Sequence, residues 1–449
     1  MIVNIAEPTP FLKPSRLPSS LRVMTFVLSV FIAAPATAGS LEQELAGFIN
    51  NHPLIKAGRS TVQSVGETIN IGNAGYLPTL RLNSTAGPQV IDNPTTRAAG
   101  KDSSRVINTS TLTLTQNLFN GFQTHSQVRT ARLNKALAQV TLEGTVQNTL
   151  FEGISAYIDV LRQLRLVQLS ANNQATIQQQ LHLEDERVQR GSGIAVDVLQ
   201  AKSRLQLAKE RRITFEGALE DAVSRFAQVF NHAPNVDAMT DPVPPVEMIP
   251  SELEKAIDIA LEQNPAIINS AVTVETARQG RATVSAQYAP IIDVVGTLNY
   301  EKDNAGTIGT RRDYSVLLQA NWDLFTGFST KAGVSQASYD YATSRNNHDQ
   351  TVRKVIEQMQ LSWQALLTAR SRLELLENAV SIASEVFASR KKLREAGKDT
   401  VINVLDAENE VNNAQINYTS ASYEERLAIY QVLLAMGRLN PVYLNLASN

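Results

Sequence analysis

The side chains that commonly carry catalysis or hold metals are sparse in this sequence, and they are not grouped. Cysteine is absent, which excludes disulfides, thiolate metal sites and a cysteine nucleophile. The five histidines show neither the His-x-x-x-His nor the His-Glu-x-x-His spacing of helical metal sites: His52, His125, His182, His232 and His348. Neither a Gly-x-Ser-x-Gly motif nor a P-loop is present. We therefore predict a protein that is not an enzyme, with no catalytic residue, cofactor or metal.

Two further stretches resemble binding motifs, and each has a simpler interpretation. The segment His182-Leu183-Glu184-Asp185-Glu186 contains metal-ligand residue types, but on a helix these side chains point around the axis, which favours a solvated charge cluster. The glycines of Gly191-Ser192-Gly193 follow a predicted helix, whereas phosphate-cradling loops follow a strand. Function must therefore come from the arrangement of helices and strands.

Composition narrows the class of protein. The 449 residues include 41 Lys and Arg against 43 Asp and Glu, and the net charge of -2 does not provide the basic face that nucleic-acid binding requires. With 43% hydrophobic and 19% charged residues, the chain is expected to fold, and it is not a polytopic helical membrane protein.

The N-terminal residues 1–38 have the pattern of a secretory signal peptide. Lys13, Arg16 and Arg22 precede an apolar run over 23–34, and the small residues of Ala36-Thr37-Ala38 follow it. A single spanning helix is the alternative, but the run is shorter than the roughly 18–20 residues that a bilayer requires. We predict export, with the mature chain periplasmic, secreted or inserted as a β-barrel.

The rest of the sequence is an internal repeat. Pro53 and Pro265 stand in similar contexts 212 positions apart, as do the prolines of Tyr76-Leu77-Pro78 and Tyr288-Ala289-Pro290. Further on, Leu118-Phe119-Asn120-Gly121-Phe122 matches Leu324-Phe325-Thr326-Gly327-Phe328 at an offset of 206. A proline-rich linker over 241–250 separates the copies. We predict a first repeat over 39–240, a second over 251–437 and a tail over 438–449.

Each repeat is predicted to contain an opening helix, a β-hairpin, a long helix, a short turn and a return helix. The second opening helix is expected to begin at Ser251 as N-cap, with Glu254 completing a capping box. The long stretches contain no proline, and at about 1.5 Å per residue each could span roughly 100 Å. The expected helices cover 41–74, 124–190 and about 195–230 in the first repeat, and 251–287, 329–396 and about 400–436 in the second.

The hairpins show period-two alternation with one apolar and one largely polar face. The clearest apolar series are Ile292, Val294, Gly296, Leu298 and Tyr300, then Tyr314, Val316, Leu318, Ala320, Trp322 and Leu324. Each second strand is about ten residues or slightly longer, enough to cross a bilayer when tilted. Aromatic residues gather where the strands end: Phe119, Phe122, Trp322, Phe325 and Phe328. They are expected either to form a membrane-interface belt or to pack at a strand-to-helix corner.

Four strands cannot close a barrel, and an open sheet edge is not tolerated in lipid. If the hairpins insert, several copies must share one barrel; three copies fit a conduit better than two, which would give a narrow barrel filled by side chains.

This duplicated layout resembles the TolC-like outer-membrane channel family over nearly the whole mature chain. The motifs above carry the resemblance, above all Gly397-Lys398-Asp399-Thr400-Val401-Ile402-Asn403-Val404-Leu405-Asp406-Ala407, which is similar to the turn-and-helix signature of that family. The resemblance implies a mainly α homotrimer, with a shared twelve-stranded β-barrel in the outer membrane and a long periplasmic α-helical barrel. It also implies docking to an inner-membrane ABC or RND-type transporter through a periplasmic adaptor, and export of proteins or small toxic compounds.

The resemblance further implies a periplasmic aperture ringed by acidic side chains. It assigns this role to Asp197, Asp399, Asn403 and Asp406, where Asn403 replaces an aspartate of the family and Asp399 replaces a basic residue. Three symmetry-related carboxylates would concentrate cations and repel anions. The alternatives are a helix N-cap for Asp197 and Asp399 and a solvated face for Asp406. The helix-hairpin tips expected to dock the adaptor contain Arg190, Gly191, Gly193, Arg394, Gly397 and Lys398.

A second hypothesis remains open at this stage: a periplasmic coiled-coil adaptor or scaffold, whose strands form a small soluble domain. Such a protein would not require duplicated hairpins of lipid-spanning length. Absence of cysteine removes the acceptor for an N-terminal lipid anchor and slightly favours secretion-type relatives. The cargo is not determined by the sequence.

Overall fold

The structure is a computed structural model that describes residues 39–92, 94–98, 100, 104–305, 308–444 and 446. The predicted signal peptide, 1–38, lies outside the described residues.

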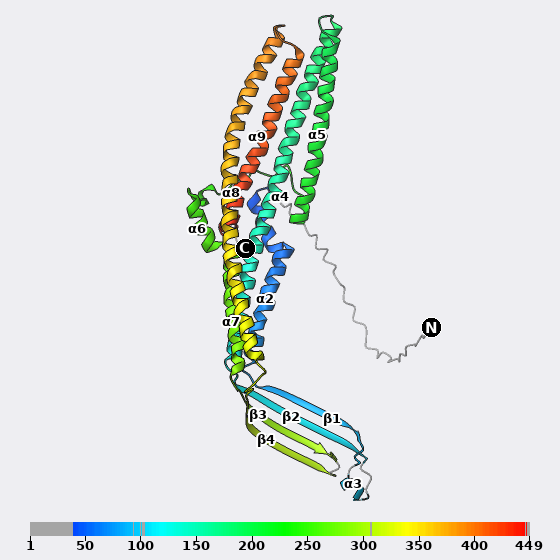
Figure 1. The fold of residues 1–449 in the computed structure, drawn as a ribbon. Coiled ribbons are helices and arrows are strands. Elements are labelled where there is room, and N and C mark those ends of the chain that lie inside the picture. Colours follow the sequence, from blue (N-terminus) through cyan, green and yellow to red (C-terminus); the bar gives the residue numbers. More distant parts are fainter. Residues whose placement is uncertain are drawn as a thin grey trace, which may run out of the picture. The chain divides into compact units, whose positions relative to one another are not determined.

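Four helices dominate the chain and form two antiparallel hairpins (Figure 1). The long helices α4 (Gln123–Gln189) and α8 (Ser329–Glu395) have 67 residues each, and the return helices α5 (Ala195–Phe230) and α9 (Val401–Met436) have 36 each. Each long helix is uninterrupted because it contains no proline. The predicted pattern of long helix, turn and return helix is confirmed in both repeats.

The opening helix of each repeat is broken once, so the predicted continuous helices were wrong. In the first repeat α1 (Leu41–Asn51) ends and α2 (Pro53–Ala74) begins around His52; in the second, α6 (Leu253–Gln263) and α7 (Pro265–Ser285) meet at Asn264. His52 and Asn264 are extended, with ψ 129 and 122, because the residue before a proline is driven out of the helical region. Each proline then starts the next helix at a position where its missing N–H is no loss.

The predicted capping box at Ser251 is also not present. The N-cap of α6 is Glu252, which makes no side-chain capping bond; its carboxylate lies 3.1 Å from the Lys255 ammonium. Ser251 is therefore the residue before the N-cap, and its hydroxyl does not cap the N–H groups of the first turn. Two short 3₁₀ helices flank this region, η1 (Val246–Met248) and η2 (Ala286–Tyr288).

The two β-hairpins, one from each repeat, join into one antiparallel four-stranded sheet of order β1-β2-β3-β4 (Figure 1). The strands are β1 (Thr79–Gln89), β2 (Arg105–Phe119), β3 (Ile291–Lys302) and β4 (Thr310–Asn321), with the short helix α3 (Pro94–Ala98) between β1 and β2. Because β4 ends at Asn321, Trp322 and Leu324 lie beyond the strand that was predicted to include them. The central pairing, β2 with β3, joins the two repeats.

The register aligns the apolar positions of all four strands on one face of the sheet. Leu82 pairs with Leu112, Leu112 with Leu298, and Leu298 with Tyr314, so one row of apolar side chains crosses the whole sheet. The opposite face is largely polar, and the Thr111 hydroxyl donates to the Asn299 amide oxygen at 2.8 Å there. The predicted division into an apolar and a polar face therefore extends over the sheet.

The main hydrophobic core lies where α1 and α6 pack on the middle of the long helices. Tyr157 of α4 is fully buried in it, and its hydroxyl lies 2.9 Å from the carbonyl oxygens of Gly39 and Thr240. At the start of the linker, the Asp241 carboxylate accepts from the Tyr423 hydroxyl at 2.7 Å and from Arg426 at 3.0 Å. These contacts hold both ends of the first repeat against the helices of the two hairpins.

Candidate functional site

The candidate site is built on the two helix-hairpin tips, whose turns have the same backbone design. Gly191 after α4 and Gly397 after α8 have φ of +76 and +68, left-handed values that close a helix end at low cost only for glycine. The Ser192 N–H donates to the Arg187 carbonyl at 3.0 Å, and the Lys398 N–H donates to the Leu393 carbonyl at 2.9 Å. Both bonds satisfy carbonyl groups at the helix ends.

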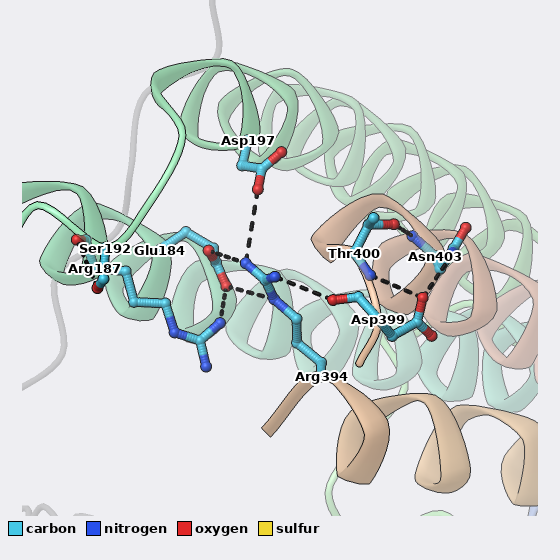
Figure 2. A network of polar contacts seen from close by, with 8 residues as sticks. All are labelled: Glu184, Arg187, Ser192, Asp197, Arg394, Asp399, Thr400 and Asn403. Carbon is cyan, nitrogen blue, oxygen red and sulfur yellow. Dashed lines mark hydrogen bonds and ion pairs between the residues drawn. The ribbon is translucent and has the colours of Figure 1, made fainter. Parts of the chain in front are cut away.

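Arg394, in the last turn of α8, connects the two tips (Figure 2). Its guanidinium donates to both carboxylate oxygens of Glu184 on α4, at 2.6 and 3.4 Å, and lies 3.6 Å from the Asp197 carboxylate at the start of α5. A third bond runs to the backbone carbonyl of Asp399 at 3.1 Å. The Glu184 side chain is 1% exposed and also accepts from Arg187 at 2.6 Å. One cation therefore joins α8, α4 and α5 around a buried carboxylate.

Asp399 organises the start of α9 from the position just before the helix. Its carboxylate accepts from the Asn403 amide at 2.6 Å, from the Thr400 N–H at 2.8 Å and from Arg390 at 3.1 Å. The hydrogen bond from Asn403, together with that from Arg390, lowers the pKa of Asp399 below its ordinary value. The N-cap itself is Thr400, whose hydroxyl accepts from the Asn403 N–H at 3.4 Å. Asp399 is therefore not the N-cap, as the alternative interpretation expected, but the residue before it.

Below the tips the two hairpins meet in a narrow apolar seam with polar ties beside it. The seam consists of residues from α4, α5 and α9: Ile177, Ala201, Leu205, Ala208, Val401 and Leu405. Beside it, Arg204 of α5 donates to Asp406 of α9 at 2.6 Å, and Arg211 donates to Asn413 at 2.9 Å. Asp406 remains 54% exposed, so its charge faces solvent as well as its partner.

A buried acid lies next to the seam on α9, two residues after Asp406. Glu408 is 5% exposed, and one of its oxygens accepts from the Asn173 amide of α4 at 3.2 Å. Its other oxygen has no hydrogen-bond partner among the described residues, nor does either polar side-chain atom of the neighbouring Asn412. Burial raises the pKa of Glu408 to about 8.

The structure therefore brings four of the predicted site residues together and separates the others. Asp197, Arg394, Asp399 and Asn403 share one connected network (Figure 2), whereas Asp406 pairs separately with Arg204. The remaining predicted tip residues are exposed or lie in the turns: Arg190, Gly191, Gly193, Gly397 and Lys398. Of these, Arg190 pairs with Glu186 of its own helix at 3.1 Å.

Glu184 corrects the sequence interpretation of residues 182–186. These residues were predicted to form a solvated charge cluster, but the Glu184 side chain is buried, because α8 packs its Arg394 against that side of α4. A signal was present in the repeat: at the 206-residue offset Glu184 corresponds to Arg390, so equivalent positions carry opposite charges. On the exposed side of the same segment, the His182 ring Nε2 lies 3.2 Å from the Glu186 carboxylate.

The predicted aromatic residues form the same corner in both repeats. Phe119 and Phe122 meet edge to face with ring centroids 5.6 Å apart, and Phe325 and Phe328 do so at 5.4 Å. Phe122, Phe325 and Phe328 are each more than two-thirds exposed. Trp322 is also exposed, and its indole N–H donates to the Tyr288 carbonyl at 3.1 Å. These rings contact each other and still present apolar surface outward.

Two features are absent from the described part of the chain. No group of three or more His, Asp or Glu residues there is placed to hold a metal ion. None of the helices in this part is both long and apolar enough for a membrane span.

Comparison with known proteins identifies the family. The family model described as outer membrane efflux protein matches residues 47–232 and 256–438. The chain is 26% identical over 398 residues to the outer membrane efflux protein BepC of Brucella suis biovar 1 (strain 1330), covering 88% of this chain and 85% of BepC. It is 23% identical over 446 residues to the alkaline protease secretion protein AprF of Pseudomonas aeruginosa, covering 95% and 92% of the two chains. A solved membrane protein from Pseudomonas aeruginosa has the same fold, with a TM-score of 0.78 and 17% identity over 88% of this chain and 90% of that chain.

The duplicated helix hairpins, the four-stranded sheet and these matches define an outer-membrane export channel with a large periplasmic helical part. The chain belongs to the outer membrane efflux protein family. The resemblance to TolC-like channels is thereby confirmed, and the adaptor or scaffold alternative is not supported.

Proposed function

We propose that three copies of this chain form the passive exit duct of a tripartite export system. The sheet carries this proposal: β1 and β4 are its edges, and neither has a second partner strand within the described residues. Edges of this kind are not tolerated in lipid, and four strands are too few to close a barrel. Three copies supply twelve strands and a pore, whose wall continues into the periplasm as paired helices.

The duct is proposed to work without catalysis or cofactor. An inner-membrane transporter of the ABC or RND type would supply the energy, and a periplasmic adaptor would connect the two by docking on the helix-hairpin tips. The residues at the turns offer backbone and cationic groups to such a partner: Arg190, Gly191, Gly193, Gly397 and Lys398. Cargo of both kinds is represented among relatives, since BepC is an efflux protein and AprF a protease secretion protein.

We propose that the tips also form the periplasmic aperture. Asp197 and Asp406 would place negative charge around it, with Asp399 and Asn403 ordering the start of α9. The Arg394–Glu184 pair would hold the hairpins together in the closed state, because it joins α8 to α4 around a buried carboxylate. The exposed corner aromatics would lie at the membrane interface.

We further propose that the chain is divided into a signal peptide, 1–38, two repeats, 39–240 and 251–437, a linker between them, 241–250, and a tail, 438–449.

The absence of native cysteine allows a direct test of the assembly. One cysteine introduced on β1 and one on β4 should crosslink neighbouring copies in the outer membrane, giving a ladder that ends at three chains. The matched control carries both cysteines on β2 and β3, which pair within one chain and should give no ladder. A ladder that ends at two, or a chain recovered only in the soluble fraction, would refute the trimeric duct.

A further inference from the structure

The charged residues of the sheet are divided between its two faces. The described strands contain eight of them: Arg81, Arg105, Asp293, Glu301, Lys302, Arg311, Arg312 and Asp313. By the strand register, six lie on the polar face. The two on the apolar face are Lys302 and Arg312, and both are cations. No strand carboxylate shares that face.

Both cations lie at the same end of the apolar face. Arg312 pairs with Tyr300, and Lys302 pairs with Thr310, in the two rows nearest the turn between β3 and β4. The two cations are separated by one strand spacing across the sheet and two residues along it, so their Cα atoms are roughly 8 Å apart. Both residues are exposed. The opposite end of this face, where the strands join the helices, has no charged strand residue. Its last row consists of Phe119, Ile292 and Ala320.

The rows that carry the cations also carry hydrogen-bonding side chains. The Arg312 row continues through Ser110 and Ser84, whose hydroxyl oxygens are 2.9 Å apart, and the Lys302 row continues to Asn108. The next rows toward the helices are apolar. The turn end of this face therefore changes within one row from hydrocarbon side chains to cations, hydroxyls and an amide.

Arg312 lies against the aromatic ring of its cross-strand partner. Its guanidinium carbon lies 5.9 Å from the centroid of the Tyr300 ring on the adjacent strand. This contact leaves the N–H fork of the guanidinium available, and that fork matches two oxygens of a phosphate. Arg311, its sequence neighbour, faces the other way and pairs with Asp313 at 2.9 Å.

We propose that Lys302 and Arg312 bind the phosphate groups of a phosphorylated glycolipid in the outer leaflet of the membrane. The inference rests on the proposed trimeric barrel, which turns the apolar face of the sheet toward lipid. At that level the cations meet headgroups and the rows below meet acyl chains. Charge complementarity favours an anionic headgroup, because the described strands place two positive groups and no negative one on this face.

The test uses purified protein in mixed micelles that contain diphosphoryl lipid A, with bound lipid counted by native mass spectrometry. The double variant Lys302→Gln/Arg312→Gln should bind this lipid on the order of 10- to 100-fold more weakly, since both charged donors to the phosphates are lost. Dephosphorylated lipid A should bind the original chain and the double variant equally. Inorganic phosphate in millimolar amounts should not displace the lipid, because the acyl chains contribute to its binding.

Arg311→Gln is the matched control, with the same charge change at the same end of the sheet but on the other face. The inference would be overturned if this control lost as much lipid as the double variant, or if the double variant bound lipid as well as the original chain. If trimers were present in the same spectra, the proposed duct would still stand. Spectra that contained only monomers of the original chain would instead overturn both proposals. Competition by inorganic phosphate alone would reassign the site to a soluble anion.

Discussion

Removal of the Arg394 guanidinium should open the proposed aperture. In Arg394→Gln, Glu184 loses bonds of 2.6 and 3.4 Å, and the tie between α8 and α4 is lost. Breaking a buried ion pair costs about 3–5 kcal/mol when the remaining charge has no other partner. Here Glu184 keeps Arg187 at 2.6 Å, so we expect a smaller cost of about 1–3 kcal/mol per protomer. An equilibrium shift of that size corresponds to roughly 5–150-fold in favour of the open state.

Single-channel recording in planar bilayers measures this shift directly as open probability. Glu184→Gln should also raise it, because Arg394 then keeps only the Asp197 carboxylate, at 3.6 Å, as an ionic partner on the neighbouring hairpin. The double variant should open less than the sum of the two single effects, with a coupling energy on the order of 1–2 kcal/mol. Arg190→Gln is the control: this exposed cation pairs within its own helix, and its removal should leave the open probability unchanged.

Two results would refute this reasoning. The first is an Arg394→Gln channel whose open probability equals that of the original chain. The second is strict additivity of the two single variants, which would show that the residues act independently of their contact.

Three further predictions concern other parts of the chain. Replacing Asp197 and Asp406 by alanine should reduce cation selectivity, measured as reversal potential in a salt gradient; an unchanged potential would remove both from the aperture. Burial raises the pKa of Glu408 to about 8, so the folded chain keeps a proton that the unfolded chain loses near pH 4.5. The free energy of unfolding should therefore fall between those two pH values, by up to about 1.4 kcal/mol per pH unit. Glu408→Gln should flatten this decline in melting temperature from pH 5 to 8, and an equally steep decline would contradict the assignment. Gly121→Ala should lower the melting temperature more than Gly327→Ala. Both glycines have left-handed φ, +64 and +61, but only at Gly121 would an added Cβ lie 2.5 Å from a backbone oxygen of η2. Equal melting temperatures of the two variants would refute this clash.

Local patterns in the sequence determined the order of elements. The stretches without proline became α4 and α8, the Gly191 and Gly397 turns ended them, and period-two alternation marked the strands. Each of these signals is contained within a few neighbouring residues, so it can be read without knowing what packs against the segment. The break at Pro53 is equally local, because the residue before a proline is driven out of the helical region whatever packs against it.

Contacts between distant segments decided the rest. Whether Glu184 is solvated or buried depends on Arg394, 210 positions away, and that distance is closed only when α8 packs on α4. The register of β3 against β4 put Lys302 and Arg312 on one face, and the pairing of β2 with β3 added Ser110 and Asn108 to their rows. Composition and spacing specify which side chains are available, whereas the burial and electrostatic environment of each depend on packing between elements far apart in the chain.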